Sequence, residues 1–139
     1  MKKLTLNVDT SQATSARYAF FILAAVEEID GTPLDLSGIT SDDNSSLLNF
    51  FQNARNLREV RFKGSINTVM SMGNNELSKN SILSLIPCLS DEAADKTLTL
   101  SQAAVNTAFE TSSGAADGST SEEWTTLVDS KPNWTISLV

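Results

Sequence analysis

The side chains that most often carry enzymatic chemistry are scarce in this sequence. Histidine does not occur and Cys88 is the single cysteine, so a histidine-based triad, a Cys–His pair and a Cys/His zinc site are excluded. Cys88 lies in an apolar run, which favours a buried small side chain over a reactive thiol. Glu27–Glu28 and Asp42–Asp43 are neighbours in the chain, whereas acid–base catalysis needs carboxylates spaced across a cleft. We therefore expect no enzyme, no catalytic residue, no metal site and no cofactor.

Four cations form the one basic cluster of the sequence: Arg55, Arg58, Arg61 and Lys63. Glu59 interrupts the cluster, and no aromatic residues alternate with the cations as they do on surfaces that bind single-stranded nucleic acid. The net charge of −7 also repels phosphate backbones. We interpret the cluster as a charged, solvent-facing surface and expect no nucleic-acid partner.

The strands that must position these residues follow from period-2 alternation of apolar and polar residues. This alternation predicts strands with one buried face at 3–8, 57–63, 96–101 and 133–138. In the second of these strands, Val60 and Phe62 are expected to point inward. The side chains expected to point outward from it are Glu59, Arg61 and Lys63.

A helical period appears between the strands, and it predicts helices at 45–54, 78–89, 102–110 and 121–130. Ser78 is expected to cap the second helix, and Pro87 to tighten its last turn. Thr120 and Glu123 are expected to form a capping box for the fourth.

Strands that alternate with short helices favour an α/β fold with parallel strands on one side and helices on the other. The chain also resembles itself, because residues 20–29 align with 50–60 with one gap, which places Phe21 and Phe51 30 residues apart. A period of that length is typical of repeat proteins. The stretches 31–44 and 111–120 are interpreted as loops between repeats, the first with a short strand candidate at 34–36.

Residues 49–64 resemble one unit of the leucine-rich-repeat surface proteins of gut and oral bacteria (the BspA type) and of related repeat regions in phage tail proteins. The aromatic pair Phe50–Phe51, a short polar stretch and the strand beginning at Leu57 carry this resemblance. Residues 96–101 and 133–138 are similar to the closing units of such arrays. The resemblance covers roughly residues 15–139 and implies a short leucine-rich-repeat-like solenoid, a single domain over 1–139 with 90–139 as its C-terminal cap.

The sequence departs from the family pattern in two respects. The asparagine ladder of regular repeats is not evident, and residues 64–77 fit no unit. Within that stretch Met70 and Met72 share the strand parity of Ile66, so we expect both in the core.

The outward face of the strands is the candidate binding surface. If the strands are parallel neighbours, the side chains that share this polar face are Glu59, Arg61, Lys63, Thr97, Thr99, Thr135 and Ser137. Solenoids bind partners through such faces. The alternative is that the Thr and Ser residues are there simply as good strand formers.

These observations favour a non-enzymatic binding or adhesion module that recognises a protein or glycan on a cell surface. The resemblance implies a virion (tail or fibre) or bacterial-surface setting. A purely structural subunit that packs on neighbouring virion subunits is the second hypothesis, and an enzyme of an unfamiliar kind is the third. No apolar segment of a signal peptide follows Met1–Lys3, and the apolar run 18–26 is too short to span a membrane.

Overall fold

The computed structural model describes residues 2–16, 20, 23–41, 47–110 and 117–139. Within these residues the chain is mixed α/β, with two parallel three-stranded sheets, three α-helices and no closed barrel. The first sheet consists of β1 (Lys3–Leu6), β2 (Glu28–Asp35) and β3 (Glu59–Lys63), and the second of β4 (Met70–Met72), β5 (Lys96–Leu100) and β6 (Trp134–Leu138). The helices are α1 (Lys79–Leu85), α2 (Gln102–Ala108) and α3 (Glu122–Asp129), with 3₁₀ turns η2 (Ile86–Cys88) and η3 (Gly118–Thr120).

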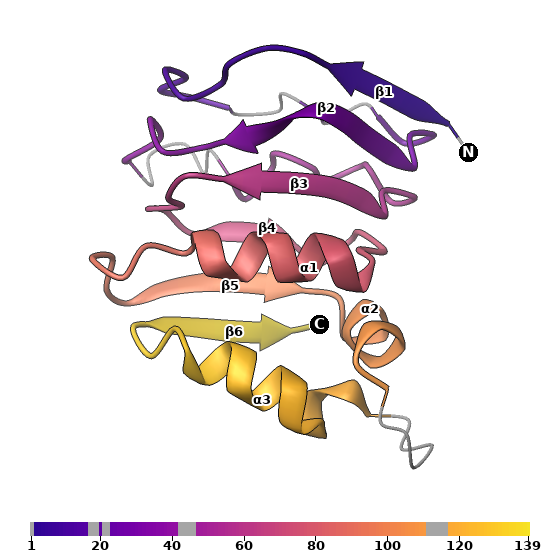
Figure 1. Cartoon of the computed structure of the whole chain (residues 1–139), viewed down its shortest axis with the longest axis vertical. Coiled ribbons are helices and arrows are strands. Elements are labelled where there is room, and N and C mark those ends of the chain that lie inside the picture. The colour runs from indigo at the N-terminus through magenta and orange to yellow at the C-terminus, as the bar shows by residue number, and fades with distance from the viewer. Residues whose placement is uncertain (1, 17–19, 21–22, 42–46, 111–116) are drawn as a thin grey trace.

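The strands follow one another along the long axis of the molecule in chain order (Figure 1). The strands of the first sheet all run in one direction, and those of the second run in the opposite direction. The parallel pairing is therefore confirmed, and β1, β3, β5 and β6 lie within the predicted strand segments. The expectation of strands gathered on one side is wrong, because β3 and β5 belong to different sheets.

Helix α1 explains why the first sheet stops at β3, because two of its serines bond the free edge of that strand. The N–H groups of Val60 and Phe62 donate to Ser81 Oγ at 3.0 Å and to Ser84 Oγ at 2.7 Å. The hydroxyls in turn donate to the carbonyls of Arg58 at 2.7 Å and Phe62 at 3.3 Å. Serines three positions apart lie on one face of a helix, so both reach the same strand. α1 occupies the place that a fourth strand would take.

The helices at 78–89, 102–110 and 121–130 are confirmed, with one correction to a cap. Ser78 caps α1 by accepting from the Ser81 N–H, and Pro87 lies in the 3₁₀ turn that ends this helix, as predicted. The capping box is wrong: Ser121 caps α3 by accepting from the Trp124 N–H at 3.1 Å. Glu123 instead pairs with Lys79 on α1, at 2.6 Å.

The helix predicted at 45–54 is wrong for residues 47–54, and residues 45 and 46 lie outside the described part. Leu47 forms a parallel bridge with Met70, and turns follow to Ala54. The ring of Phe20 stacks on Phe51 at 5.2 Å and meets Phe50 edge-on at 5.0 Å. Phe50 and Phe51 are both buried within this turn segment. The aromatic packing brings together the two segments whose similarity suggested a repeat.

Strand β2 was missed because residues 31–44 contain Gly31 and Pro33 and were interpreted as a loop. The register of β2 against β3 shifts between Ile29 and Leu34, and Gly31 has a φ of +96° within this irregularity. A Cβ at Gly31 would lie 2.2 Å from the carbonyl oxygen of Leu6, so only glycine fits there. The strand candidate at 34–36 is confirmed in part, since Leu34 and Asp35 belong to β2.

The core lies between the layers formed by the strands and helices. Val60 and Phe62 are buried as expected, and so are Met70 and Met72 on β4. Cys88 differs from the expectation, because its side chain is only half-buried.

We expect Ser81→Ala to lower the free energy of unfolding by about 1–3 kcal/mol, because it leaves the Val60 N–H without a bonding partner and removes one of the two donors to the Arg58 carbonyl. Urea denaturation followed by circular dichroism measures this change. Thr125→Ala, at an exposed position of α3, is the control. Equal stability of the two variants would contradict the role assigned to the serine.

We expect Leu98→Ala to cost roughly 2–5 kcal/mol, because Leu98 is 0 % exposed at the centre of the second sheet. Its neighbour Thr99 points to the other face of the sheet, so Thr99→Ala is expected to change stability by no more than about 0.5 kcal/mol. Thermal unfolding of both variants checks the parity of β5, and a larger loss for Thr99→Ala would show that this parity is inverted.

Candidate functional site

The seven residues of the predicted outward face lie on two separate sheets. Glu59, Arg61 and Lys63 lie on β3 of the first sheet. On the second sheet, Thr97 is in register with Thr135, and Thr99 with Ser137, so the predicted neighbourhood of β5 and β6 is confirmed. The predicted neighbourhood of β3 and β5 is wrong, because α1 occupies the free edge of β3. The single polar face is replaced by a charged face on the first sheet and a hydroxyl face on the second.

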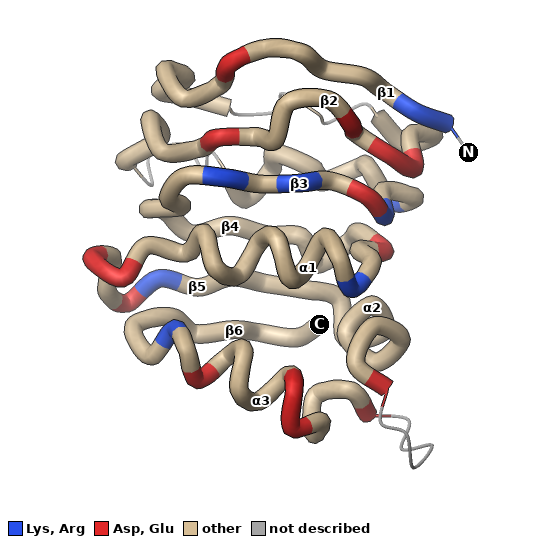
Figure 2. The backbone as a smooth tube through the Cα atoms, viewed as in Figure 1, with Lys and Arg blue, Asp and Glu red and all other residues tan. Residues whose placement is uncertain are grey.

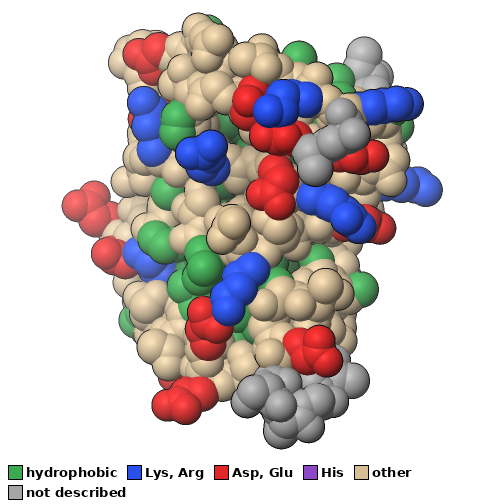
Figure 3. All heavy atoms as spheres, turned by 45° about the vertical axis from the view of Figure 1, so that its right-hand side comes forward, with side chains coloured by type: hydrophobic (Ala, Val, Ile, Leu, Met, Phe, Trp, Pro, Cys, Tyr) green, Lys and Arg blue, Asp and Glu red, His purple; other side chains and the backbone are tan. Residues whose placement is uncertain are grey.

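The charged face consists of Lys3, Glu28, Asp30, Glu59, Arg61 and Lys63. Residues of both signs lie along β1, β2 and β3 in the backbone view (Figure 2), and acidic and basic side chains lie close together on one face of the molecule (Figure 3). Glu28 is in register with Glu59, an arrangement that brings like charges together. Lys3 reduces this repulsion, because its Nζ lies 3.2 Å from Glu28 and 2.9 Å from Asp30.

Asp30 is a carboxylate of the charged face that bonds Lys3 through one oxygen, Oδ2. A hydrogen bond from the Thr5 side chain, followed by one from Lys3, holds the pKa of Asp30 below its ordinary value. The same pairing with Asp30, and then Glu28, raises the pKa of Lys3. Both groups therefore stay charged at neutral pH and give the face a fixed pattern of charges.

The hydroxyl face lies on the second sheet and carries no charge between its strands. Ser71 on β4 is in register with Thr99, which is in register with Ser137. Thr97 and Thr135 form a second row. Thr99 and Ser137 are half-buried, and this face is shallow.

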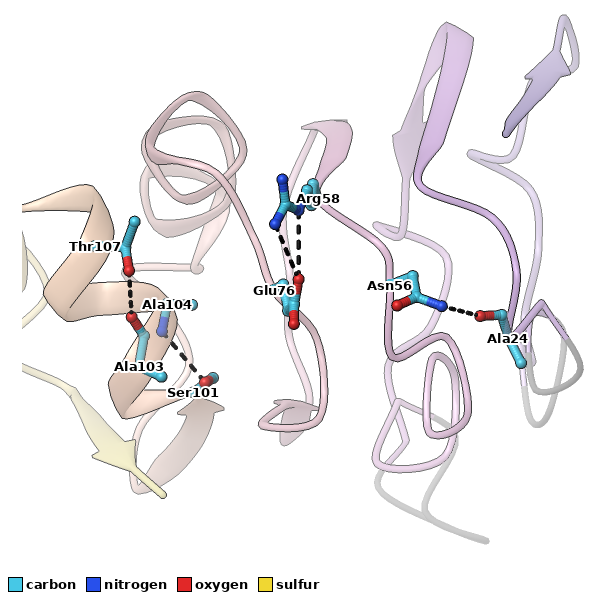
Figure 4. Close-up of polar contacts among 8 residues, drawn as sticks. All are labelled: Ala24, Asn56, Arg58, Glu76, Ser101, Ala103, Ala104 and Thr107. Carbon is cyan, nitrogen blue, oxygen red and sulfur yellow. Dashed lines mark hydrogen bonds and ion pairs between the residues drawn. The ribbon is translucent and has the colours of Figure 1, made fainter. Parts of the chain in front are cut away.

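Among the residues that the structure describes, a groove of about 690 Å³ lies on the side of the molecule where β3 begins. One wall is formed by residues 55–59, the floor by residues 73–79, and the other wall by α2. The connection from β4 to α1 is short and lies between the turns before β3 and the helix that follows β5 (Figure 4). The groove exists because this short connection is recessed between two larger neighbours.

Backbone and side-chain hydrogen bonds hold the floor of the groove. The N–H groups of Glu76 and Ser78 donate to the carbonyls of Leu57 at 3.1 Å and Arg58 at 2.9 Å. The buried amide of Asn75 donates to Ala54 at 2.6 Å. Hydrogen bonds to residues 54, 57 and 58 therefore hold the floor of the groove in place.

The wall formed by residues 55–59 is cationic. Arg58 donates from Nε and Nη2 to a single oxygen of Glu76, at 3.3 and 3.2 Å (Figure 4). Arg55 forms no ion pair with any residue that the structure describes. Lys79 also lines the groove, but Glu123 holds it at 2.6 Å, and it lies 5.4 Å from the centre of the Phe109 ring.

The wall formed by α2 is small and uncharged. Ser101 caps this helix by accepting from the Ala104 N–H, and Thr107 donates to the carbonyl of Ala103 at 3.0 Å. Both contacts turn the hydroxyls back toward the helix (Figure 4). The methyl groups of three alanines complete the wall: Ala103, Ala104 and Ala108.

Sequence reasoning detected only part of this groove. Arg55 and Arg58 were recognised as basic but interpreted as solvated, and of the seven predicted residues only Glu59 lines the groove. The signal that was available is the polarity of α2, whose face opposite Val105 and Phe109 carries alanines and a threonine instead of the usual charges. The recess itself depends on how the turns stack, and no local pattern contains that information.

The described residues hold no cluster of three or more metal-ligating side chains. The Cys88 thiol donates to the Ser84 carbonyl, and burial raises its pKa, so the neutral thiol is favoured at neutral pH. Cys88 is not among the groove residues. The side chains that line the groove include guanidinium donors and methyl groups.

Comparison with protein-family models, with curated proteins and with solved structures finds no match. In the part of the chain that the structure describes, no helix has the length and apolar character needed to cross a membrane.

We expect Thr5→Val and Lys3→Ala each to raise the pKa of Asp30, because each removes a hydrogen bond to the charged carboxylate. Since folding lowers this pKa, the contribution of Asp30 to stability is present above the pKa of the unfolded chain and is lost as the pH falls through that of the folded chain. An NMR titration of the carboxyl carbons measures the pKa of Asp30 in the parent chain and in each variant.

Asp9 is the internal control for this titration. Its pKa is also lowered, by the backbone N–H and the hydroxyl of Ser11, and neither group contacts Thr5 or Lys3. A parallel shift of Asp9 and Asp30 would show that the substitutions act through general unfolding.

Proposed function

We propose that this chain is a non-enzymatic binding module, a short solenoid of the leucine-rich-repeat kind with 90–139 as its C-terminal cap. It recognises a protein partner through the groove and the charged face beside it. The resemblance of its sequence to bacterial surface and phage tail repeats favours a virion or bacterial-surface setting. The groove is the observation that carries the proposal, because it combines a volume of about 690 Å³ with guanidinium donors on one wall and methyl groups on the other.

Recurrent hydrogen bonds between successive turns of the chain support the solenoid. At the start of the strands, the Glu27 N–H donates to the Lys2 carbonyl at 2.8 Å, and the Arg58 N–H donates to Glu27 at 2.9 Å. The Ser78 N–H then donates to Arg58. On the opposite side of each turn, parallel pairs connect Leu47, Met70, Leu98 and Ile136 in that order.

Asparagine side chains add a second set of contacts between neighbouring turns. The amide of Asn56 donates to the Ala24 carbonyl at 2.7 Å, and that of Asn75 to Ala54. Asn133 donates to the Asp91 carbonyl at 3.0 Å. Their irregular spacing is why no ladder is visible in the sequence. Stacked units held in this way present continuous surfaces made of several turns, which suits partner binding.

A protein partner is favoured over a glycan by the position of the aromatic rings. Sugar rings pack their C–H faces on exposed aromatic side chains. Every aromatic residue that the structure describes is buried or packed against the core. Neither the groove nor the charged face contains such a ring. Charged side chains that keep a fixed pattern give specificity toward a protein surface instead.

A purely structural subunit is the second candidate, and the two outer strands favour it. β1 pairs only with β2, and β6 only with β5, among the strands described. Strand edges of this kind are sites where neighbouring subunits add. Sedimentation analysis separates the two functions, because a structural subunit assembles into a defined multimer, whereas the binding module stays functional as a monomer.

Selection of peptides displayed on phage against the immobilised chain tests the binding function. We expect the enriched peptides to lose at least about tenfold in affinity with Ala103→Trp, because the indole fills the groove without altering its charges. Thr125→Trp, at an exposed site on α3 outside the groove, is the matched control and should bind as the parent chain does. The proposal would be contradicted if no enriched peptide depends on Ala103, or if the chain binds only to immobilised glycans.

A further inference from the structure

We infer that the groove takes an extended acidic segment of the partner, with its carboxylates on Arg55 and Arg58 and its small apolar side chains against α2. This inference rests on the proposed function and specifies the ligand of the same site. It follows from the difference in charge between the two walls, from the unused N–H donors of the arginines and from the volume of the groove.

The arginines of the cationic wall retain donors for a ligand. Glu76 accepts from Nε and Nη2 of Arg58 through one oxygen, so the remaining N–H groups of this guanidinium are unused by that pair. Arg55 is exposed and has no ion pair with a described residue. Glu76 thus positions the Arg58 guanidinium and leaves its other N–H groups available to a ligand. Guanidinium groups bind carboxylates through paired N–H donors, which gives both strength and orientation.

The wall formed by α2 determines which ligand side chains fit opposite the arginines. Ala103 is exposed and Ala104 and Ala108 are half-buried, so their methyl groups border the groove without filling it. In an extended segment, successive side chains point in opposite directions. A segment that alternates acidic and small apolar residues therefore directs its carboxylates to the arginines and its methyl groups to α2.

The size of the groove limits the ligand to a short segment. A volume of about 690 Å³ lies within the range of roughly 300–1,000 Å³ in which proteins bind small ligands. Larger side chains opposite the arginines would contact α2 before the carboxylates reach their donors.

The lining of the groove argues against the other ligand classes. No aromatic ring lines the groove for base stacking, which disfavours a nucleic-acid segment. A basic segment would face the two arginines directly. Lys79 takes no part in this argument, because Glu123 already neutralises it.

Fluorescence anisotropy with a short labelled peptide of alternating Glu and Ala tests the inference. Peptides of equal length with Gln–Ala and Lys–Ala repeats are the comparison ligands. We expect the Glu–Ala peptide to bind at least about tenfold more tightly than the Gln–Ala peptide, with an affinity that falls as salt is added. The Lys–Ala peptide should bind more weakly than either.

Charge reversal at the wall gives the matched variants. Arg55→Glu and Arg58→Glu should each weaken the Glu–Ala peptide by about tenfold or more, since each replaces an attraction with a repulsion. Lys2→Glu makes the same change of charge at an exposed position outside both the groove and the charged face, and should weaken binding by no more than about twofold. Circular dichroism confirms that each variant is folded before the titration.

The outcomes separate this inference from the proposed function. Equal affinity for the Glu–Ala and Gln–Ala peptides, or equal losses in Arg58→Glu and Lys2→Glu, would overturn the acidic ligand. If selected peptides depend on Ala103 yet carry no carboxylates, the acidic ligand is wrong and the binding function stands. If no peptide depends on Ala103, the binding function itself fails.

Discussion

The free edge of β3 is the constraint on which the arrangement of this chain depends. A strand edge that is covered must have its N–H and C=O groups bonded, because an unpaired buried polar group is costly. Ser81 and Ser84 meet this requirement from α1 with four hydrogen bonds to the backbone of residues 58–62. Since α1 holds this edge, the first sheet ends after three strands, and β5 pairs in a second sheet with β4 and β6.

The same helix determines where the groove lies. α1 begins beside β3, so the chain must cross from β4 to Lys79 by a short path. Glu76 and Ser78 are bonded to the backbone of residues 57 and 58 along that path, and Asn75 reaches the carbonyl of Ala54. This connection forms the floor of the groove, and the Arg58 guanidinium beside it is hydrogen-bonded to Glu76. The recess is thus a consequence of how the edge of β3 is satisfied.

Much of the secondary structure was predictable, because local periodicity and polar caps agree with the fold at α1, α2, α3 and four of the six strands that the structure describes. β2 was not, since Gly31 and Pro33 are turn residues and their use within an irregular strand depends on the close approach of Leu6. Residues 47–54 have a helical period that aromatic packing against Phe20 overrides.

The division into two sheets was hidden for a different reason. Ser81 and Ser84 look like ordinary polar residues of a helix, and only their contact with β3 reveals their role. The candidate site was only partly predictable from the sequence for the same reason. The basic character of Arg55 and Arg58 was visible in the sequence, whereas their position opposite α2 depends on contacts between turns that are far apart in the chain.

The floor of the groove alternates anchors with free positions. Asn75 and Leu77 are buried, whereas Asn74 and Glu76 beside them are exposed. The buried pair packs in the interior, where the Asn75 amide bonds the carbonyl of Ala54. The side chains of the exposed pair lie at the surface of the groove, where Asn74 donates to the Gln52 carbonyl and Glu76 pairs with Arg58. A substitution at Asn74 or Glu76 would therefore alter the polarity and charge of the groove while the buried side chains that hold this segment stay in place.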